Sequence, residues 1–415
     1  MRRPVLLVFL AMLSLAIVTP VMPYRAMELG ASPFMVAIIM AFDTVMLVLT
    51  AFIWGRFSDH IGRKPIILLT LAVMPLSNAL LAVGDSYTLL LIARGLAGLG
   101  AAAIPVLQAY IADETNAESR TRGMAHFNGA WALAFVVGPL IAFLISRSSD
   151  NVHATIGWSV TGIAIVTLVL AALLLRRKTP VPLSIEPISV DTIMAAPEAS
   201  KVAVGKMRLL GHGLSPPMLT RAFILPITAM TVLALVWAQL DGTVGLWTSV
   251  KLSWGASQLS LAYLAAGLAG FMTQFWFTER AARWFGLVPL SIASTLVVAV
   301  SLLLPVFWAE PWALYTAMTL AGAGAATANS CYASLFSMAA PSNEQGAAMG
   351  LCHTATNAAW IVGPLLGGFV FQTVSPSAPF VVGVTAALIA TALVVLLPLT
   401  RARSSSASRE ARGNA

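Results

Sequence analysis

The sequence predicts an all-α membrane protein with twelve transmembrane helices, arranged as two pseudo-symmetric halves of six helices each. Three observations support this fold class. The composition is too apolar for a soluble protein, the basic residues collect in alternate loops between apolar segments, and short motifs recur at a spacing of about 224 residues. Twelve helices of about 20 residues use about 240 positions, close to the number of hydrophobic residues in the chain.

The composition excludes the other broad classes. Hydrophobic residues make up 59% of the 415 residues and charged residues only 10%, whereas soluble proteins average about 25% charged residues. The apolar content is also far too high for a disordered chain. A net charge of +8 would favour nucleic acid as the partner of a soluble protein. Here the basic residues lie between apolar segments, so we predict a lipid bilayer as the environment and no nucleic-acid partner.

Apolar segments, interrupted by charges and by clusters of Pro and Gly, give the expected helices in chain order. The first six are 4–24, 33–54, 66–84, 88–112, 124–146 and 155–175, and the second six are 222–249, 257–278, 288–308, 311–338, 347–371 and 377–398. The first segment resembles a secretion signal. It is long for one and no small-residue cleavage site follows, so we expect it to remain as the first span.

The long segment between the sixth and seventh helices divides the chain. It is rich in Pro, Ser and basic residues. We therefore predict a first half over 1–175, a cytoplasmic linker over 176–220, a second half over 221–398 and a cytoplasmic tail over 399–415. The two cysteines, Cys331 and Cys352, lie in apolar segments and are expected to be packing residues.

The basic residues predict the orientation. Loops on one side carry only Arg25, Arg147 and Lys251, whereas the loops and termini on the other side carry twenty Lys and Arg residues. Positive charge collects on the cytoplasmic side of membrane proteins. Both termini are therefore predicted to be cytoplasmic, in a bacterial-type inner membrane.

The two halves repeat one another at short motifs. The matching pairs are Ala31-Ser32 with Ala256-Ser257, Gly62 with Gly286, Pro65 with Pro289, Ala97–Gly100 with Ala321–Gly324, and Gly138-Pro139 with Gly363-Pro364. Their offsets are all 224 or 225 residues. Repeated halves are typical of transporters that bind substrate between the halves near the bilayer midplane.

The segment 55–65 joins the second and third expected helices with charges too dense for lipid. It contains Gly55, three residues, Asp59, two residues, Gly62 and then the basic pair Arg63-Lys64. Its glycines predict a tight turn. The segment resembles the signature loop of the major facilitator superfamily. That resemblance implies a cytoplasmic gate, in which Asp59 caps a helix N-terminus of the opposite half and pairs with Arg63, which also meets Asp113.

Two further motifs are similar to this superfamily in part. The second copy of the loop keeps Gly286 but has Arg283 in place of the acid, so the gate is expected to be asymmetric. Gly138-Pro139 in the fifth helix resembles the Gly-Pro of superfamily antiporters, which implies export rather than uptake. A proline removes one backbone hydrogen bond, so this helix is expected to bend; helix packing alone is the alternative.

Three charged residues fall inside expected helices. Asp43 lies about ten residues into the second helix, Arg94 in the fourth, and Asp241 about two-thirds of the way along the seventh. Intramembrane charges are costly and mark functional sites, and a carboxyl removed from water holds its proton to higher pH. We predict that Asp43 and Asp241 carry the coupling proton, with Arg94 and His353 as partners. The alternatives are an Arg94 side chain that reaches outward to water and a break of the seventh helix near Asp241.

A matching pattern in the fifth and eleventh helices predicts the substrate cavity. Asn128 and Trp131 in the fifth correspond to Asn357 and Trp360 in the eleventh, displaced by one helical turn,. We expect these four side chains, with Gln239, to border a central cavity. Hydrogen bonds between helices are the alternative role of the two asparagines.

The chain is predicted to be no enzyme. It has no phosphate-binding glycine loop, metal-spaced histidine pair or nucleophile elbow, so we expect no catalytic residue, no metal and no cofactor. Of the superfamily, it looks most like proton-coupled drug exporters related to the tetracycline-efflux group. That resemblance implies a monomeric proton antiporter exporting an amphipathic small molecule, such as a drug or a siderophore-like metabolite. The alternatives are uptake or exchange of a sugar or organic acid, and a non-transporting receptor or scaffold.

Overall fold

The computed structural model describes residues 2–115, 117–176, 220–340 and 345–397, and these residues are almost entirely helical. The helices before the linker are α1 (Arg2–Val18), α2 (Met22–Glu28), α3 (Pro33–Ile61), α4 (Arg63–Val83), α5 (Tyr87–Ala101), α6 (Ala103–Asp113), α7 (Ala117–Ser148) and α8 (Val152–Leu174). Those after it are α11 (Arg221–Leu252), α12 (Ala256–Met272), a π-helical turn (Thr273–Phe277), α13 (Thr278–Phe285), α14 (Leu287–Phe307), α15 (Pro311–Ala339), α16 (Gln345–Thr373) and α17 (Ala378–Val395). The predicted linker residues 177–219 and tail 399–415 lie outside the described residues.

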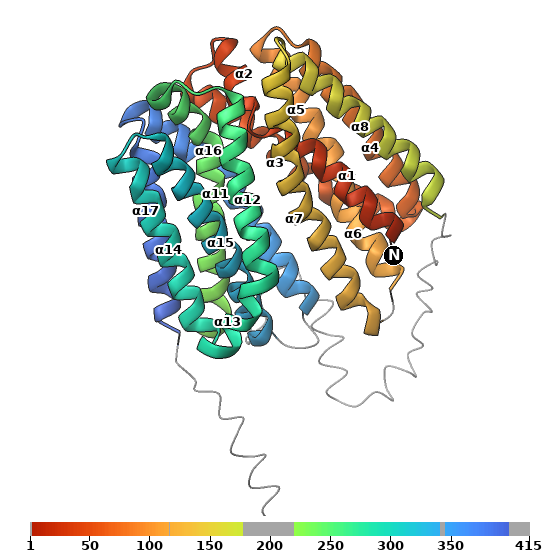
Figure 1. The fold of residues 1–415 in the computed structure, drawn as a ribbon. Helices are drawn as coiled ribbons and strands as arrows, with labels where there is room; N and C mark the ends of the chain where they lie inside the picture. The colour runs from red at the N-terminus through yellow and green to blue at the C-terminus, as the bar shows by residue number, and fades with distance from the viewer. Residues whose placement is uncertain (1, 116, 177–219, 341–344, 398–415) are drawn as a thin grey trace, which may run out of the picture.

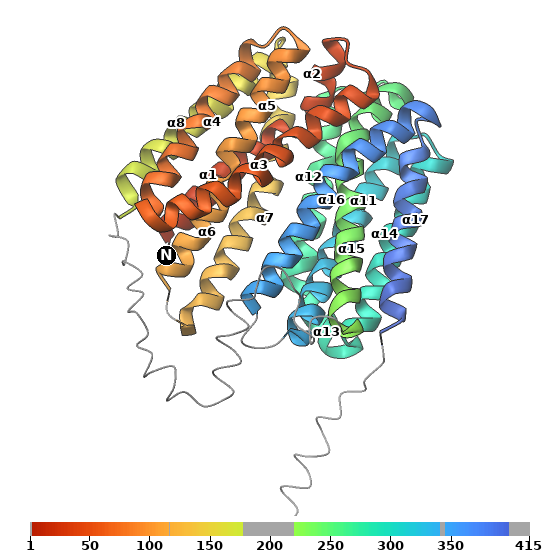
Figure 2. The same cartoon turned by 180° about the vertical axis from the view of Figure 1, so that it is seen from behind.

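The helices form two bundles, one from α1–α8 and one from α11–α17, which stand side by side in Figures 1 and 2. We call the end of the molecule where α8 ends and α11 begins the linker end, and the opposite end, which carries α2, the far end. In both views the bundles meet at the far end and diverge toward the linker end.

The helices are suited to a bilayer. Among the described residues, ten helical segments are long and apolar enough to cross a membrane, and the bent pair α1 and α2 makes an eleventh. The remaining helix, α15, has 29 residues and no charged side chain. It packs against α11, α12 and α14, and its many small residues are typical of a helix surrounded by other helices. The chain is therefore a multi-pass membrane protein, and α15 completes the twelve predicted segments.

Two predicted boundaries are wrong. The first predicted helix, 4–24, is not one continuous helix. It breaks after Val18, and α2 continues at an angle of 41°. Pro20 and Pro23, which lack backbone donors, lie at this break,. The predicted turn at 55–65 is also much shorter than expected. Gly55 lies inside α3, which continues to Ile61, and Gly62 alone makes the turn with φ of +98°.

The internal repeat is visible in the packing of glycines. A Cβ on Gly98 of α5 would lie 2.2 Å from the carbonyl oxygen of Asp43 in α3, and one on Gly322 of α15 would lie 2.3 Å from that of Ala266 in α12. Gly100 and Gly324 similarly approach the carbonyls of Thr70 and Ser294, which are 224 residues apart. The recurring motifs therefore specify the same close helix contacts twice.

The Gly-Pro motifs also serve corresponding contacts. Gly138 of α7 meets Ala16 of α1, and Gly363 of α16 meets Ala238 of α11. The helix continues through Pro139 in α7 and through Pro364 in α16. The sequence prediction left bending and packing open, and the structure supplies the packing contact in both halves.

Contacts between the bundles concentrate toward the far end. The helices α3 and α16 pack against each other, as do α7 and α12. The backbone N–H of Phe34 donates to Gln372 Oε1 at 3.2 Å, and a Cβ on Gly368 would lie 2.4 Å from that of Ala37. A Cβ on Gly267 of α12 would lie 2.6 Å from the Phe135 carbonyl oxygen in α7. The structure thus shows a state whose halves are closed together at the far end.

These close approaches predict the effect of adding volume. Gly98→Val should lower stability by about 3 kcal/mol, because its side chain must separate α5 from α3. Gly162→Val is the matched control, since a Cβ at Gly162 of α8 has no heavy atom within 4 Å. Thermal unfolding of both variants in detergent measures the difference. Equal melting temperatures would show that the α3–α5 contact accommodates the added side-chain volume with little loss of stability.

Candidate functional site

A buried ion pair joins two helices of the first bundle. Arg94 of α5 donates through Nη2 to Asp43 Oδ2 of α3, and the exposed side-chain fractions are 7% and 15%. The Thr44 backbone N–H donates to the other Asp43 oxygen at 2.7 Å. The α5 contact at Gly98 places the two helix backbones close enough for this pairing. Arg94 therefore does not reach outward to water.

The second carboxyl comes from the other bundle. Asp241 lies within α11, which is continuous from Arg221 to Leu252, so the predicted alternative of a helix break is wrong. The phenol hydroxyl of Tyr263 in α12 donates to Asp241 Oδ1 at 2.7 Å. Asp241 also lies within electrostatic reach of both Arg94 and Asp43. One cluster therefore contains two carboxyls and one guanidinium drawn from both bundles.

This central cluster occupies one layer of the molecule. Asp43 follows the start of α3 by ten residues and Asp241 precedes the end of α11 by eleven. Arg94 and Tyr263 each follow the start of their helix by seven residues. At 1.5 Å per residue the four lie roughly 10–16 Å from the far end. The cluster is therefore beneath the contacts that close that end.

The residues predicted to line a cavity fall into two groups. Asn128, Trp131 and Trp360 are exposed and Asn357 is half-buried, and all four lie on the linker side of the contacts between α7 and α12 or between α3 and α16. His353, the predicted partner of the coupling carboxyls, is exposed on the same side of α16 and lies twenty residues from its far end, away from the central cluster. Trp131 stacks on Phe135 with ring centroids 6.2 Å apart. These side chains are thus accessible where the bundles diverge.

Gln239 is placed elsewhere. It is fully buried inside the second bundle, and its Nε2 donates to the Pro379 carbonyl oxygen of α17 at 2.9 Å. Two residues along a helix turn a side chain by about 200°, so Gln239 and Asp241 point to opposite sides of α11. The prediction that Gln239 borders the central cavity is therefore wrong.

The loop motif forms the expected ion network. Arg63 bonds Asp59 at 2.6 Å and Asp113 at 3.0 Å. Both acids are about half exposed and belong to the same bundle as Arg63. Asp59 is engaged with Arg63 in this state, in which the linker ends of the bundles are apart. Among the described residues, its contacts are within the first bundle, so the predicted contact with a helix of the opposite half is not made in this state.

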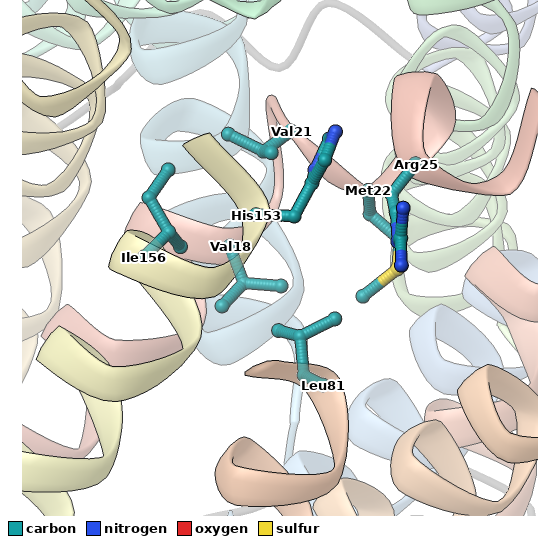
Figure 3. Close-up of a pocket in the computed structure, with 7 residues that line it drawn as sticks. All are labelled: Val18, Val21, Met22, Arg25, Leu81, His153 and Ile156. Atoms are coloured by element: carbon teal, nitrogen blue, oxygen red, sulfur yellow. The ribbon is translucent and has the colours of Figure 1, made fainter. Parts of the chain in front are cut away.

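A small cavity near the far end is separate from the central cluster. It has a volume of about 10 Å³, enough for about one water,, and Figure 3 shows Arg25 and His153 on its wall. Arg25 donates to the Gly84 carbonyl of α4, and His153 of α8 bonds Glu28 of α2 at 2.8 Å. These contacts fix α2 to the first bundle.

Sequence reasoning missed three residues: Tyr263, Tyr24 and Thr248. The Tyr24 hydroxyl and Thr248 Oγ1 share a buried hydrogen bond of 2.7 Å between α2 and α11. Their separation of 224 residues equals the repeat offset, which is the signal that would have paired them. Tyr263 was detectable as a polar-tipped side chain at the same depth as the intramembrane charges.

Two repeated helix bundles that meet at one end and carry buried charges at a common depth give this membrane protein the architecture of a secondary transporter. The sequence profile of the major facilitator superfamily matches residues 5–286 and 229–414. The chain belongs to the major facilitator superfamily, and it is a transporter rather than an enzyme.

Relatives of known type support this assignment. The chain is 26% identical over 370 residues to Multidrug resistance protein 1 of Bacillus subtilis (strain 168), covering 88% of this chain and 87% of that protein. It is 22% identical over 397 residues to the quinolone resistance protein NorA of Staphylococcus aureus (strain COL), covering 95% and 96%. The human organic anion transporter MFSD10 (TETRAN) shares the fold, with a TM-score of 0.63, 20% identity and coverage of 95% and 99%.

Proposed function

We propose that this transporter is a proton-coupled antiporter that exports an amphipathic small molecule by alternating access. The observation that supports it is the placement of the Asp43–Arg94 ion pair of one bundle and Asp241 of the other at one buried depth, within electrostatic reach of each other. Arg94 pairs with Asp43, so among the described residues the Asp241 carboxylate has a phenol as its partner and no cation in an ion pair. A proton or a substrate can satisfy that charge, and competition between them couples their movements.

The conformation fits the first step of export. With both termini cytoplasmic, the linker end faces the cytoplasm and the far end faces outside, so with the far end closed a substrate approaches the cluster from the cytoplasmic side. Substrate binding then displaces the proton, the linker end closes, and the gate residues Asp59, Arg63 and Asp113 meet the opposite half. Protonation from outside releases the substrate, and the protonated transporter then returns to the state with the far end closed.

The substrate is proposed to be an amphipathic molecule with an aromatic part. Trp131 and Trp360 expose 41% and 37% of their surface beside the diverging bundles, and Asn128 and Asn357 add polar groups on the same helices. Aromatic rings bind flat apolar groups over a large area. The names of the multidrug and quinolone resistance relatives are consistent with such a substrate.

Proteoliposomes test the proposed direction and energy source. With a quinolone as probe and an imposed proton gradient, the wild-type protein should move the quinolone against its concentration gradient and opposite to the protons. An ionophore that collapses the gradient should stop this movement. Accumulation that is unaffected by the ionophore would contradict proton antiport, and movement in the same direction as the protons would indicate uptake.

The orientation has its own test. A reporter fused after Ala415 or inserted near Ala195 should be cytoplasmic, because both positions belong to the side that carries twenty basic residues,. A reporter inserted at Asp150, between α7 and α8, should read as external. A periplasmic reading at Ala415 or Ala195 would overturn both the orientation and the span count.

A further inference from the structure

The closure at the far end contains a buried contact between the two halves. Tyr24 of α2 and Thr248 of α11 are 224 residues apart and bond at 2.7 Å. Beside it, a Cβ on Gly245 would lie 2.7 Å from Pro23. The far end cannot open unless Tyr24 leaves Thr248.

The Asp241 carboxylate lies close beneath this closure. It is seven residues, or about two turns, below Thr248 on the same helix,. Its hydrogen-bond donor Tyr263 lies within electrostatic reach of Tyr24. The Tyr263 phenol therefore bonds the carboxylate and interacts electrostatically with the tyrosine that closes the far end. The other charged groups near the carboxylate are Arg94 and Asp43.

We propose that Tyr263 is a positioning residue that couples the occupancy of Asp241 to closure of the far end. While Asp241 is ionised and empty, its carboxylate holds the Tyr263 hydroxyl at 2.7 Å and keeps it within electrostatic reach of Tyr24. A proton or a substrate at Asp241 neutralises or occupies that acceptor, weakens its bond to Tyr263 and so weakens the closure. The inference rests on the proposed function, since it assigns Asp241 alternate occupants.

The consequence is tight coupling. With Asp241 ionised and unoccupied, the transporter keeps its far end closed. With a proton or a substrate at Asp241, the far end is free to open. Loss of the Tyr263 hydroxyl should let the unoccupied transporter open its far end and change conformation without cargo. The measured result would be movement of protons or of substrate that is not coupled to movement of the other. A tyrosine that merely packs against α11 would not change the coupling.

Distance measurements between spin labels test the inference. The labels are placed at Asp150→Cys and Ser375→Cys, exposed far-end positions on the two bundles, in a Cys331→Ala/Cys352→Ala background. Without substrate near pH 8, Tyr263→Phe and Asp241→Asn should each raise the ratio of far-end-open to closed molecules about tenfold, the effect of one hydrogen bond to a charged group. The double variant should show no more than either single change.

Controls make each outcome decisive. Tyr87→Phe removes a phenol that donates to the Met35 carbonyl at 3.1 Å in the first bundle and should leave the ratio unchanged. If Tyr263→Phe does not fold, Tyr24→Phe combined with Asp241→Asn tests the same non-additivity. Additive effects, or an unchanged ratio in Tyr263→Phe, would overturn the proposal. Because the readout is conformational, failure of proton antiport in liposomes is seen separately.

Discussion

Asp43→Asn is expected to abolish uphill export and substrate-dependent proton movement in proteoliposomes, while downhill exchange and substrate binding persist. The change keeps the size of the side chain and removes the group that takes up a proton. Asp241→Asn should have the same effect on proton movement, since the two carboxyls share one electrostatic cluster with Arg94. Proton flux on addition of a quinolone, recorded with an internal pH dye, measures both variants against wild type.

A charge-balanced variant separates coupling from stability. Asp43→Asn leaves the buried Arg94 without its carboxylate, and breaking a buried ion pair costs about 3–5 kcal/mol. The double change Asp43→Asn/Arg94→Gln removes both charges and should recover much of the stability without recovering coupled proton movement. If Asp43→Asn and Asp241→Asn both still move protons with substrate as the wild type does, the two carboxyls are structural and the coupling assignment is wrong.

The fold was predictable because its signals are distributed along the whole chain. Composition requires a membrane environment, and the repeated glycine motifs mark the places where helix backbones approach. The structure shows Gly98 and Gly322 at matching contacts, as their common offset indicates. The break after Val18 was not predicted. Two nearby prolines permit either a kink or a stop, and tertiary contacts such as Arg25 with Gly84 decide which.

The central cluster was only partly predictable. The sequence marked Asp43, Arg94 and Asp241 because charges are rare in apolar segments, but no local pattern states which charges meet. The error at Gln239 arose because Gln239 and Asp241 are neighbours in sequence. Helical rotation places their side chains about half a turn apart, so they are not neighbours in space. Tyr263 escaped notice because a tyrosine in an apolar segment is not unusual, and its role depends on the α11–α12 arrangement.

Asp59→Asn is expected to reduce transport to a small fraction of the wild-type rate with expression largely intact. In the present state Asp59 bonds Arg63 at 2.6 Å and its side chain is 53% exposed. Exposed pairs of this kind contribute less than about 1 kcal/mol to stability, so folding should be little affected. The cost arises when the linker end closes, because α11, α14 and α16 begin at that end and a helix N-terminus favours a negative side chain.

The second bundle supplies a matched control for this prediction. Glu279 forms an ion pair with Arg283 four residues on, as Asp59 does with Arg63, and both members are largely exposed on α13. Glu279→Gln therefore removes a comparable surface charge from the second copy of the loop, which lacks the motif's acid, and should retain near-wild-type transport. Quinolone efflux from inverted vesicles, normalised to protein content, compares the two variants. Near-wild-type efflux in Asp59→Asn would show that the segment is only a turn, whereas equal losses in both variants would indicate a general requirement for surface charge at the linker end.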